Sequence, residues 1–300
     1  MTDIRQRWLR EIGHPAEAGK MGERTLIARY DEAEFTAELY RQENGEGRYQ
    51  RLLMAFPKQG KGPFPAVAVP FYKAEHMLGY DPGTGEVYPR YQKAPIMLDL
   101  LRRGYAVASA DAYHISYYDS DRAPMDFTRW QEASVLLRKA NPHWSGIGKL
   151  VSDTRLVIDA LAEDERVDAD RIGIAGFSLG GKMAFYTGCL DDRIRAIMAA
   201  DFGFLWHQTN WQDNWYWASH VEVLKEKGMD HGQLLSACAP KPICILGGEF
   251  DTEESGEKLM LVPGYEPDDG RRMYLRYGTE HRPTKEGLEA GYDFLDKWLK

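Results

Sequence analysis

The spacing of apolar residues along this 300-residue chain changes near residue 63. Before it, residues 35–40 alternate between apolar and polar positions, residues 44–47 form a glycine-containing turn cluster, and residues 49–56 form a second run. Such alternation, interrupted by turn residues, indicates paired strands. This region is therefore predicted to form an antiparallel hairpin.

After residue 63, short continuous apolar runs are separated by stretches with helical periodicity. The runs are residues 66–71, 105–110, 171–175, 194–200, 242–246 and 273–277. Apolar strands that alternate with helices are typical of a parallel sheet with helices on both faces. Helices are expected over residues 152–162 and after a cap at Thr284. The predicted fold class is therefore α/β, with a mostly parallel central sheet and an N-terminal antiparallel hairpin.

Two stretches depart from this rhythm, and each follows the carboxyl end of a predicted strand. Residues 111–148 are rich in Tyr, Asp and Pro, and residues 202–232 carry four tryptophans among polar residues. Ligands of parallel α/β sheets bind at that edge, so both stretches are predicted to be cap insertions. At this length one elaborated domain is the default. Residues 35–300 are predicted to form it, with residues 1–34 as an N-terminal helical extension.

The most informative motif is G-x-S-x-G at residues 176–180. It lies between the apolar run 171–175 and a helix-like stretch that begins at Lys182. Only small residues allow the backbone to turn so sharply from a strand into a helix. Such a nucleophile elbow exposes its serine hydroxyl at the sheet edge. Ser178 is therefore the candidate nucleophile for attack on an acyl carbon.

A nucleophilic serine needs a base within hydrogen-bond reach and a third group that orients the base. In hydrolases with this elbow, an acid and then a histidine follow the serine along the chain. Asp251 lies on the loop after the fifth parallel run, and His281 lies just before the last helix. We therefore predict Ser178, Asp251 and His281 as catalytic residues. Glu249 and Asp201 compete with Asp251 for the place of the acid.

Together, these three features resemble the α/β-hydrolase superfamily, and within it the branch of dienelactone hydrolases and acetyl xylan esterase-like proteins, over residues 48–300. The resemblance implies that Ser178 is the nucleophile, His281 the base and then the acid, and Asp251 its orienter. It also implies a serine carboxylic ester hydrolase whose partner is a small-molecule ester, such as an acetylated carbohydrate. Lactone hydrolysis, as in dienelactone hydrolases, acyl-peptidase activity and a non-catalytic ligand-binding protein of this fold are the alternatives.

An acyl-transfer site also needs hydrogen-bond donors for the oxyanion of the tetrahedral intermediate. The backbone N–H of Leu179, directly after the nucleophile, is the first candidate. The second is expected on the loop after residues 66–69, where many relatives carry His-Gly or a glycine run and this chain carries Pro70. Proline has no N–H, so the donor is the N–H of Phe71 or Tyr72, or the phenol of Tyr72. A Pro-Tyr step in cocaine esterase-like relatives looks similar and contributes a phenol.

The tryptophans of residues 202–232 admit two interpretations. They could form a stacking platform for a sugar ring or an aromatic acyl group, or they could pack the cap onto the core. His207 lies on a predicted loop near the mouth of the site, where it either touches substrate or is solvated. The candidate substrate-binding residues are Trp206, His207, Trp211 and Trp215.

A rival interpretation uses the same motif, because residues 176–182 also match the phosphate-binding pattern G-x-x-x-x-G-K. The run 194–200, which Asp201 follows directly, resembles the strand whose aspartate holds magnesium in nucleotide-binding proteins. Met183, however, stands where a Ser or Thr should bind the metal, and several strands precede the motif although such loops usually follow the first strand. The sequence therefore disfavours nucleotide binding.

Composition narrows the choice of partner and compartment. The net charge is −8 with acids and bases interspersed, which disfavours nucleic acid and membrane surfaces. The three cysteines have no metal-ligand spacing, and the proposed mechanism requires neither a metal nor a cofactor. Because the first residues lack an apolar leader and no window approaches a membrane span, a cytoplasmic protein is expected. The sequence leaves a homo-oligomer open.

Overall fold

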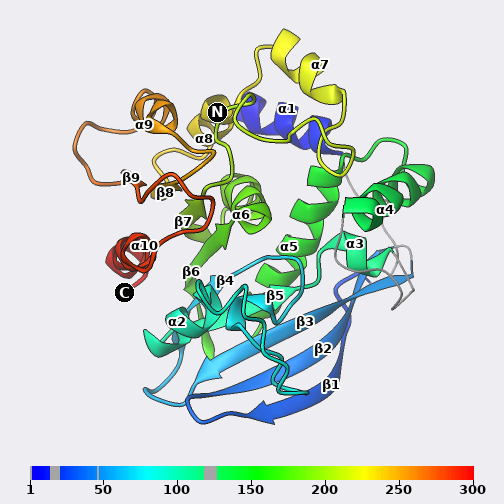
Figure 1. The fold of residues 1–300 in the computed structure, drawn as a ribbon, viewed down its shortest axis with the longest axis vertical. Helices are drawn as coiled ribbons and strands as arrows, with labels where there is room; N and C mark the ends of the chain where they lie inside the picture. The colour runs from blue at the N-terminus through cyan, green and yellow to red at the C-terminus, as the bar shows by residue number, and fades with distance from the viewer. Residues whose placement is uncertain (1, 14–20, 46, 118–126) are drawn as a thin grey trace.

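The structure, a computed structural model, describes residues 2–13, 21–45, 47–117 and 127–300 (Figure 1). Within these ranges, nine strands form one sheet in the order β1-β2-β3-β5-β4-β6-β7-β8-β9. Strands β1 to β3 pair antiparallel with one another and β3 with β5, whereas all later pairs are parallel. The bounds are β1 Arg24–Asp31, β2 Phe35–Gly45, β3 Arg48–Pro57, β4 Phe64–Ala68, β5 Ala106–Ala110, β6 Val167–Phe177, β7 Ile194–Ala200, β8 Ile243–Gly247 and β9 Arg272–Arg276.

Helices cover both faces of the parallel strands. They are α1 Thr2–Ile12, η1 His76–Leu78, α2 Ile96–Arg102, α3 Tyr113–Ser116, α4 Phe127–Ala140, α5 Gly146–Ala162, α6 Leu179–Leu190, α7 His220–Glu226, α8 His231–Ser236, α9 Glu253–Met260 and α10 Lys285–Leu299. In Figure 1, α5 and α6 lie on one side of the parallel strands and α2 and α10 on the other. The predicted α/β fold with a mostly parallel sheet is confirmed.

The core consists of two apolar clusters, one on each face of the sheet, because neighbouring residues of a strand point to opposite faces. Along the parallel strand β4, Ala66 and Ala68 join the cluster under α5 and α6, whereas Val67 joins the cluster under α2 and α10. Side chains buried on both faces explain why the parallel strands appear as continuous apolar runs in the sequence.

The N-terminal extension is only partly helical. The helix α1 ends at Ile12, and Arg24–Asp31 forms β1, which pairs antiparallel with β2. The expectation of a helical extension over residues 1–34 was therefore wrong for this part, because β1 is a largely exposed edge strand without a continuous apolar run. Residues 14–20 of the predicted extension lie outside the described residues.

The described residues of both predicted insertions contain helices. Residues 111–148 include α3, α4 and the start of α5, and residues 202–232 include α7 and the start of α8. The predicted helix 152–162 begins six residues earlier than expected, at Gly146, where the hydroxyl of Ser145 caps it. Residues 118–126 of the first insertion and Glu46 of the predicted hairpin turn lie outside the described residues.

The register of the parallel strands brings their carboxyl ends to one edge of the sheet. Phe177 at the end of β6 pairs with Ala200 of β7, and Ala200 pairs with Leu246 near the end of β8. The residues that follow these strands therefore lie next to one another. They include Ser178, Asp201 and the loop that contains Asp251.

Candidate active site

Ser178 occupies a backbone conformation that only a tightly packed turn maintains. Its φ is 58°, in the left-handed region, and its N–H donates to the carbonyl of Ala200 at 2.9 Å. A Cβ on Gly176 would overlap the carbonyl of Gly180, and a Cβ on Gly180 would overlap the carbonyl of Pro70. The elbow thus requires glycine on both sides of the serine. Strained non-glycine residues of this kind persist where the surrounding structure holds them, often at functional sites.

His281 links the serine to a buried carboxylate. Its Nε2 lies 2.8 Å from Oγ of Ser178, and its Nδ1 lies 2.7 Å from Oδ2 of Asp201. The Asp201 side chain is fully buried, whereas 30% of the His281 side chain is exposed. An ionised carboxylate can only accept hydrogen bonds, so Nδ1 carries the proton and Nε2 is left to accept the hydroxyl proton of Ser178. The arrangement can therefore activate the serine as a nucleophile.

The imidazole of His281 is also held from its sides and through its backbone. The rings of Phe177 and Phe250 each lie 4.7 Å from it between centroids. The phenol of Tyr277 donates to the His281 carbonyl at 2.8 Å. These contacts restrict the ring to the orientation in which both of its nitrogens are used.

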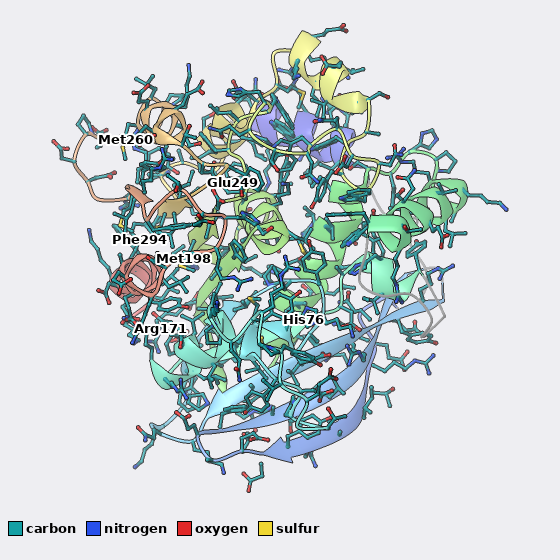
Figure 2. The ribbon with its side chains drawn as sticks, in the orientation of Figure 1. His76, Arg171, Met198, Glu249, Met260 and Phe294 are labelled. Carbon is teal, nitrogen blue, oxygen red and sulfur yellow. The ribbon has the colours of Figure 1, made fainter. Side chains whose placement is uncertain are left out.

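The acid that faces His281 is Asp201 and not Asp251, which the sequence had favoured. Both aspartates follow neighbouring parallel strands and both stand between the serine and the histidine in the chain, so their order does not distinguish them. Asp251 is buried instead against the loop after β7, where it accepts N–H groups of residues 202–204 and the hydroxyl of Ser255. Glu249 lies exposed on the loop after β8 (Figure 2).

Comparison with known proteins agrees with this architecture. The dienelactone hydrolase family matches residues 89–215. YtaP of Bacillus subtilis (strain 168), a protein whose assignment as a hydrolase is provisional, is 28% identical over 258 residues, which are 81% of this chain and 81% of YtaP.

Solved structures of esterases share the whole fold. A glucuronoyl esterase from Solibacter usitatus superposes with a TM-score of 0.69 at 15% identity, over 98% of this chain and 91% of that chain. A Bacteroides fragilis protein, provisionally an acetyl xylan esterase, superposes with a TM-score of 0.69 at 18% identity, over 100% of this chain and 84% of that chain. The chain therefore has the α/β-hydrolase fold. The expectation of an enzyme of the hydrolase class is confirmed.

The candidate oxyanion donors lie at the start of α6 and on the loop that follows β4. Leu179 is the first residue of α6, and N–H groups in the first turn of a helix have no partner within the helix. The ring of Phe71 stacks on Phe177 at 6.3 Å, and the backbone of Pro70 touches the start of α6 at Gly180. Burial raises the pKa of the Tyr72 phenol to about 12, so this group stays protonated and able to donate at neutral pH.

The predicted substrate-binding tryptophans lie mainly in a packed aromatic cluster. Trp211 is fully buried, and its Nε1 donates to the carbonyl of Gly203 at 2.8 Å. Trp206 donates to the carbonyl of Met229. Both rings pack on His231, at 4.6 and 4.1 Å. For these two residues the structure therefore agrees with the interpretation as core packing, because their polar groups are already paired inside the protein.

The other two candidates lie farther from the interior. The half-buried Trp215 stacks on Phe127 at 5.6 Å. His207 is exposed and lies 3.1 Å from a carboxylate oxygen of Glu254 at the surface. No contact joins either residue to Ser178 or His281 among the described residues.

Lys182 is a buried group that sequence reasoning noticed only as part of the phosphate-binding pattern. Its Nζ lies 3.3 Å from Thr209 Oγ1 and 3.3 Å from Asn210 Oδ1, over the ring of Trp211. Burial lowers its pKa to about 7, although Asp251 and other acids oppose the shift. The sequence feature that could have identified Lys182 as a buried group is its place within an otherwise apolar helix. Phe250 and Tyr277 at His281 were also missed, because their role depends on contacts across the sheet edge.

Neither a metal-binding cluster nor a membrane-spanning helix is found among the residues that the structure describes. These residues contain no group of three or more His, Cys, Asp or Glu side chains arranged to hold a metal ion. None of the helices among them combines the length and the apolar character needed to cross a membrane.

Proposed function

We propose that this protein is a serine carboxylic ester hydrolase that works through an acyl-enzyme. The observation that carries the proposal is the continuous hydrogen-bonded chain from Ser178 Oγ through both nitrogens of His281 to Asp201. In this arrangement His281 can take the hydroxyl proton of Ser178 while Asp201 orients its ring, and the strained elbow holds the serine at the sheet edge.

The proposed reaction begins when His281 Nε2 removes the Ser178 hydroxyl proton as Oγ attacks the ester carbonyl carbon. Buried Asp201 stabilises the imidazolium that forms. The imidazolium then gives its proton to the departing alcohol, which leaves an acyl group on Oγ. A water molecule, deprotonated by His281, attacks the acyl carbon and releases the acid and the free serine.

The negative oxygen of the tetrahedral intermediate needs donors prepared in advance. The N–H of Leu179 is the proposed first donor, supported by its place at the positive end of α6. The N–H of Phe71, or a donor of Tyr72, is the proposed second. Its support is the packing of this loop against Phe177 and Gly180.

The proposed substrates are small esters, such as acetylated carbohydrates. Their support is the likeness to proteins named as acetyl xylan and glucuronoyl esterases. Lactones are the second candidate, because the matching family is named for dienelactone hydrolysis. A panel of acetylated sugars, aryl esters, lactones and prolyl amides distinguishes these classes.

Replacing Ser178 with alanine removes the atom that forms the acyl-enzyme, so kcat on a short-chain aryl ester should fall by about a million-fold. A fluorophosphonate probe should label the wild-type protein at Ser178, as located by peptide mass spectrometry.

Ser236→Ala is the matched control. Ser236 is a half-buried serine at the end of α8, and its hydroxyl donates to the carbonyl of Gln233. This variant should keep wild-type turnover and labelling. An S178A protein that hydrolyses the ester at the wild-type rate would refute the mechanism. A wild-type protein that neither reacts with the probe nor turns over any member of the panel would favour a non-catalytic binding protein.

A further inference from the structure

Two fully buried carboxylates at the ends of β7 and β8 each bind the backbone of the other's loop. Asp201 accepts the four N–H groups of residues 248–251 at 2.8–3.1 Å. Asp251 accepts the three N–H groups of residues 202–204 at 2.6–3.0 Å, and the Ser255 hydroxyl at 2.9 Å. The two loops are therefore joined by reciprocal side-chain clamps.

Only one of these carboxylates touches the proposed base. Asp201 uses Oδ2 for both Glu249 N–H and His281 Nδ1. The hydrogen bonds to the Asp251 carboxylate come from the loop after β7 and from Ser255 in α9. Burial raises the pKa of Asp251 despite these donors, so keeping this carboxylate in the interior opposes its ionisation. Because the Asp251 carboxylate does not bind His281, its role is expected to differ from that of the acid in proton transfer.

The turn after β7 needs such support. Asp201 has a φ of 43° and Gly203 a φ of 82°, so the chain reverses through the left-handed region directly at the proposed acid. A non-glycine residue in that region is held only when its surroundings determine its conformation. The three N–H groups that Asp251 binds belong to the three residues that follow Asp201.

We propose that Asp251 is a positioning residue for the chain Ser178–His281–Asp201. By holding the N–H groups of residues 202–204, it fixes the turn that aims the Asp201 carboxylate at Nδ1 of His281. This inference rests on the proposed function, since it assigns Asp251 a role in that same site.

The experiment compares Asp251→Asn, Ser255→Ala and Asp201→Asn with the wild-type enzyme. An asparagine at 251 turns an NH2 group toward N–H donors, so the turn should shift. A displacement of about 1 Å at a catalytic group can cost on the order of 100-fold in rate, and we expect kcat to fall by roughly that factor with KM little changed. Ser255→Ala removes one donor to Asp251 and should give a smaller loss. Asp201→Asn should lose about 10⁴-fold.

The pH dependence distinguishes positioning from a general loss of structure. With Asp201 misaligned, the imidazolium form of His281 is less stabilised, so the acid limb of kcat/KM should move to lower pH in Asp251→Asn. Asp153→Asn replaces another fully buried carboxylate, which pairs with Lys149 in α5. This control should lower the unfolding free energy and leave the acid limb in place.

Three results would overturn the inference. The first is a folded Asp251→Asn enzyme with wild-type kcat. The second is a reduced kcat with an unmoved acid limb. The third is an Asp251→Asn loss near 10⁴-fold beside a mild Asp201→Asn loss, which would make Asp251 the acid itself. If Asp251→Asn does not fold, Ser255→Ala is the variant to be measured in its place. An acid limb that does not move in Ser255→Ala also overturns the inference.

Labelling by a fluorophosphonate separates this inference from the proposed function. A wild-type protein that is not labelled at Ser178 refutes the proposed function. A wild-type protein that is labelled, beside an Asp251→Asn protein labelled equally fast at every pH, refutes only the positioning role. Labelling that slows in Asp251→Asn, with its acid limb at lower pH, supports both.

Discussion

At the scale of single residues, the site depends on a glycine that has no side chain as well as on the residues that react. Gly180 follows the nucleophile by two positions and lets the backbone of α6 touch the Pro70 carbonyl. This contact joins the elbow to the loop with the second proposed oxyanion donor. The obstacle to a larger residue is backbone, which cannot rotate away as a flexible side chain could.

Gly180→Ala is therefore expected to impair both stability and turnover. The added methyl should push α6 and the Pro70 loop apart, at a cost of roughly 1–3 kcal/mol of unfolding free energy, and kcat should fall because the oxyanion donors separate. Urea unfolding and ester hydrolysis measure the two effects. Gly278 has open space around its Cβ position, so Gly278→Ala should change stability by less than about 1 kcal/mol. Equal behaviour of the two variants would contradict this account.

At the scale of elements, the tryptophan-rich insertion and the N-terminal helix form one packing unit. Trp8 of α1 is fully buried, with its ring 6.4 Å from Trp206, 6.2 Å from Trp217 and 6.5 Å from His231. Figure 1 shows α1 beside α7 and α8, away from the antiparallel strands. The insertion therefore gains its shape by packing on a helix almost two hundred residues earlier in the chain.

Trp8→Ala should destabilise the protein strongly, because it leaves a large cavity between α1 and the insertion. We expect a loss of about 3–5 kcal/mol in unfolding free energy, measured by urea denaturation followed by circular dichroism. Gln6 lies exposed on the same helix, and Gln6→Ala should change stability by less than about 0.5 kcal/mol. A small effect of Trp8→Ala would show that α1 is not an integral part of the fold.

At the scale of the whole molecule, buried neutral histidines make the free energy of unfolding depend on pH. His231 Nδ1 lies 2.8 Å from the Phe204 carbonyl, and its Nε2 lies 2.8 Å from the Tyr186 hydroxyl, which also accepts from Trp217. This network uses every polar atom of the neutral ring. Burial lowers the pKa of His231 to about 3, and it lowers the pKa of His76, labelled in Figure 2, to a similar value.

The sign of the pH effect follows from these lowered values. Each histidine contributes stability that is fully present above the unfolded pKa of about 6.5 and is lost as pH falls toward about 3. The unfolding free energy should decline over this window by up to about 1.4 kcal/mol per pH unit for each histidine. The buried Asp153, whose pKa is raised to about 6, opposes this trend between roughly pH 4 and 6.

Comparing variants isolates the contribution of one histidine. The slope of unfolding free energy against pH, measured by urea denaturation between pH 4.5 and 6, should be shallower in His231→Phe by about the single-histidine amount. His143 is exposed, and His143→Phe should keep the wild-type slope. Equal slopes in the wild type and His231→Phe would show that His231 is not held neutral.

Features that depend on residues close together in the chain could be predicted from the amino-acid sequence. The parallel strands were predictable because side chains buried on both faces give continuous apolar runs. The elbow at Ser178 was predictable because its glycines are local necessities, and His281 was predictable from its place before α10. The expected cap at Thr284 is present, since its hydroxyl accepts the N–H of Gly287 at 3.1 Å.

The acid that faces the histidine and the positions of the tryptophans follow from long-range packing, so they could not be predicted from local sequence. Asp201 and Asp251 have the same local signature, a carboxylate after an apolar strand, and they differ only in which loop faces His281 across the sheet edge. The edge strand β1 was missed for a related reason, because pairing with β2 and not an apolar run of its own holds it in place. Contacts between distant segments depend on strand order and packing, which no short stretch of sequence contains.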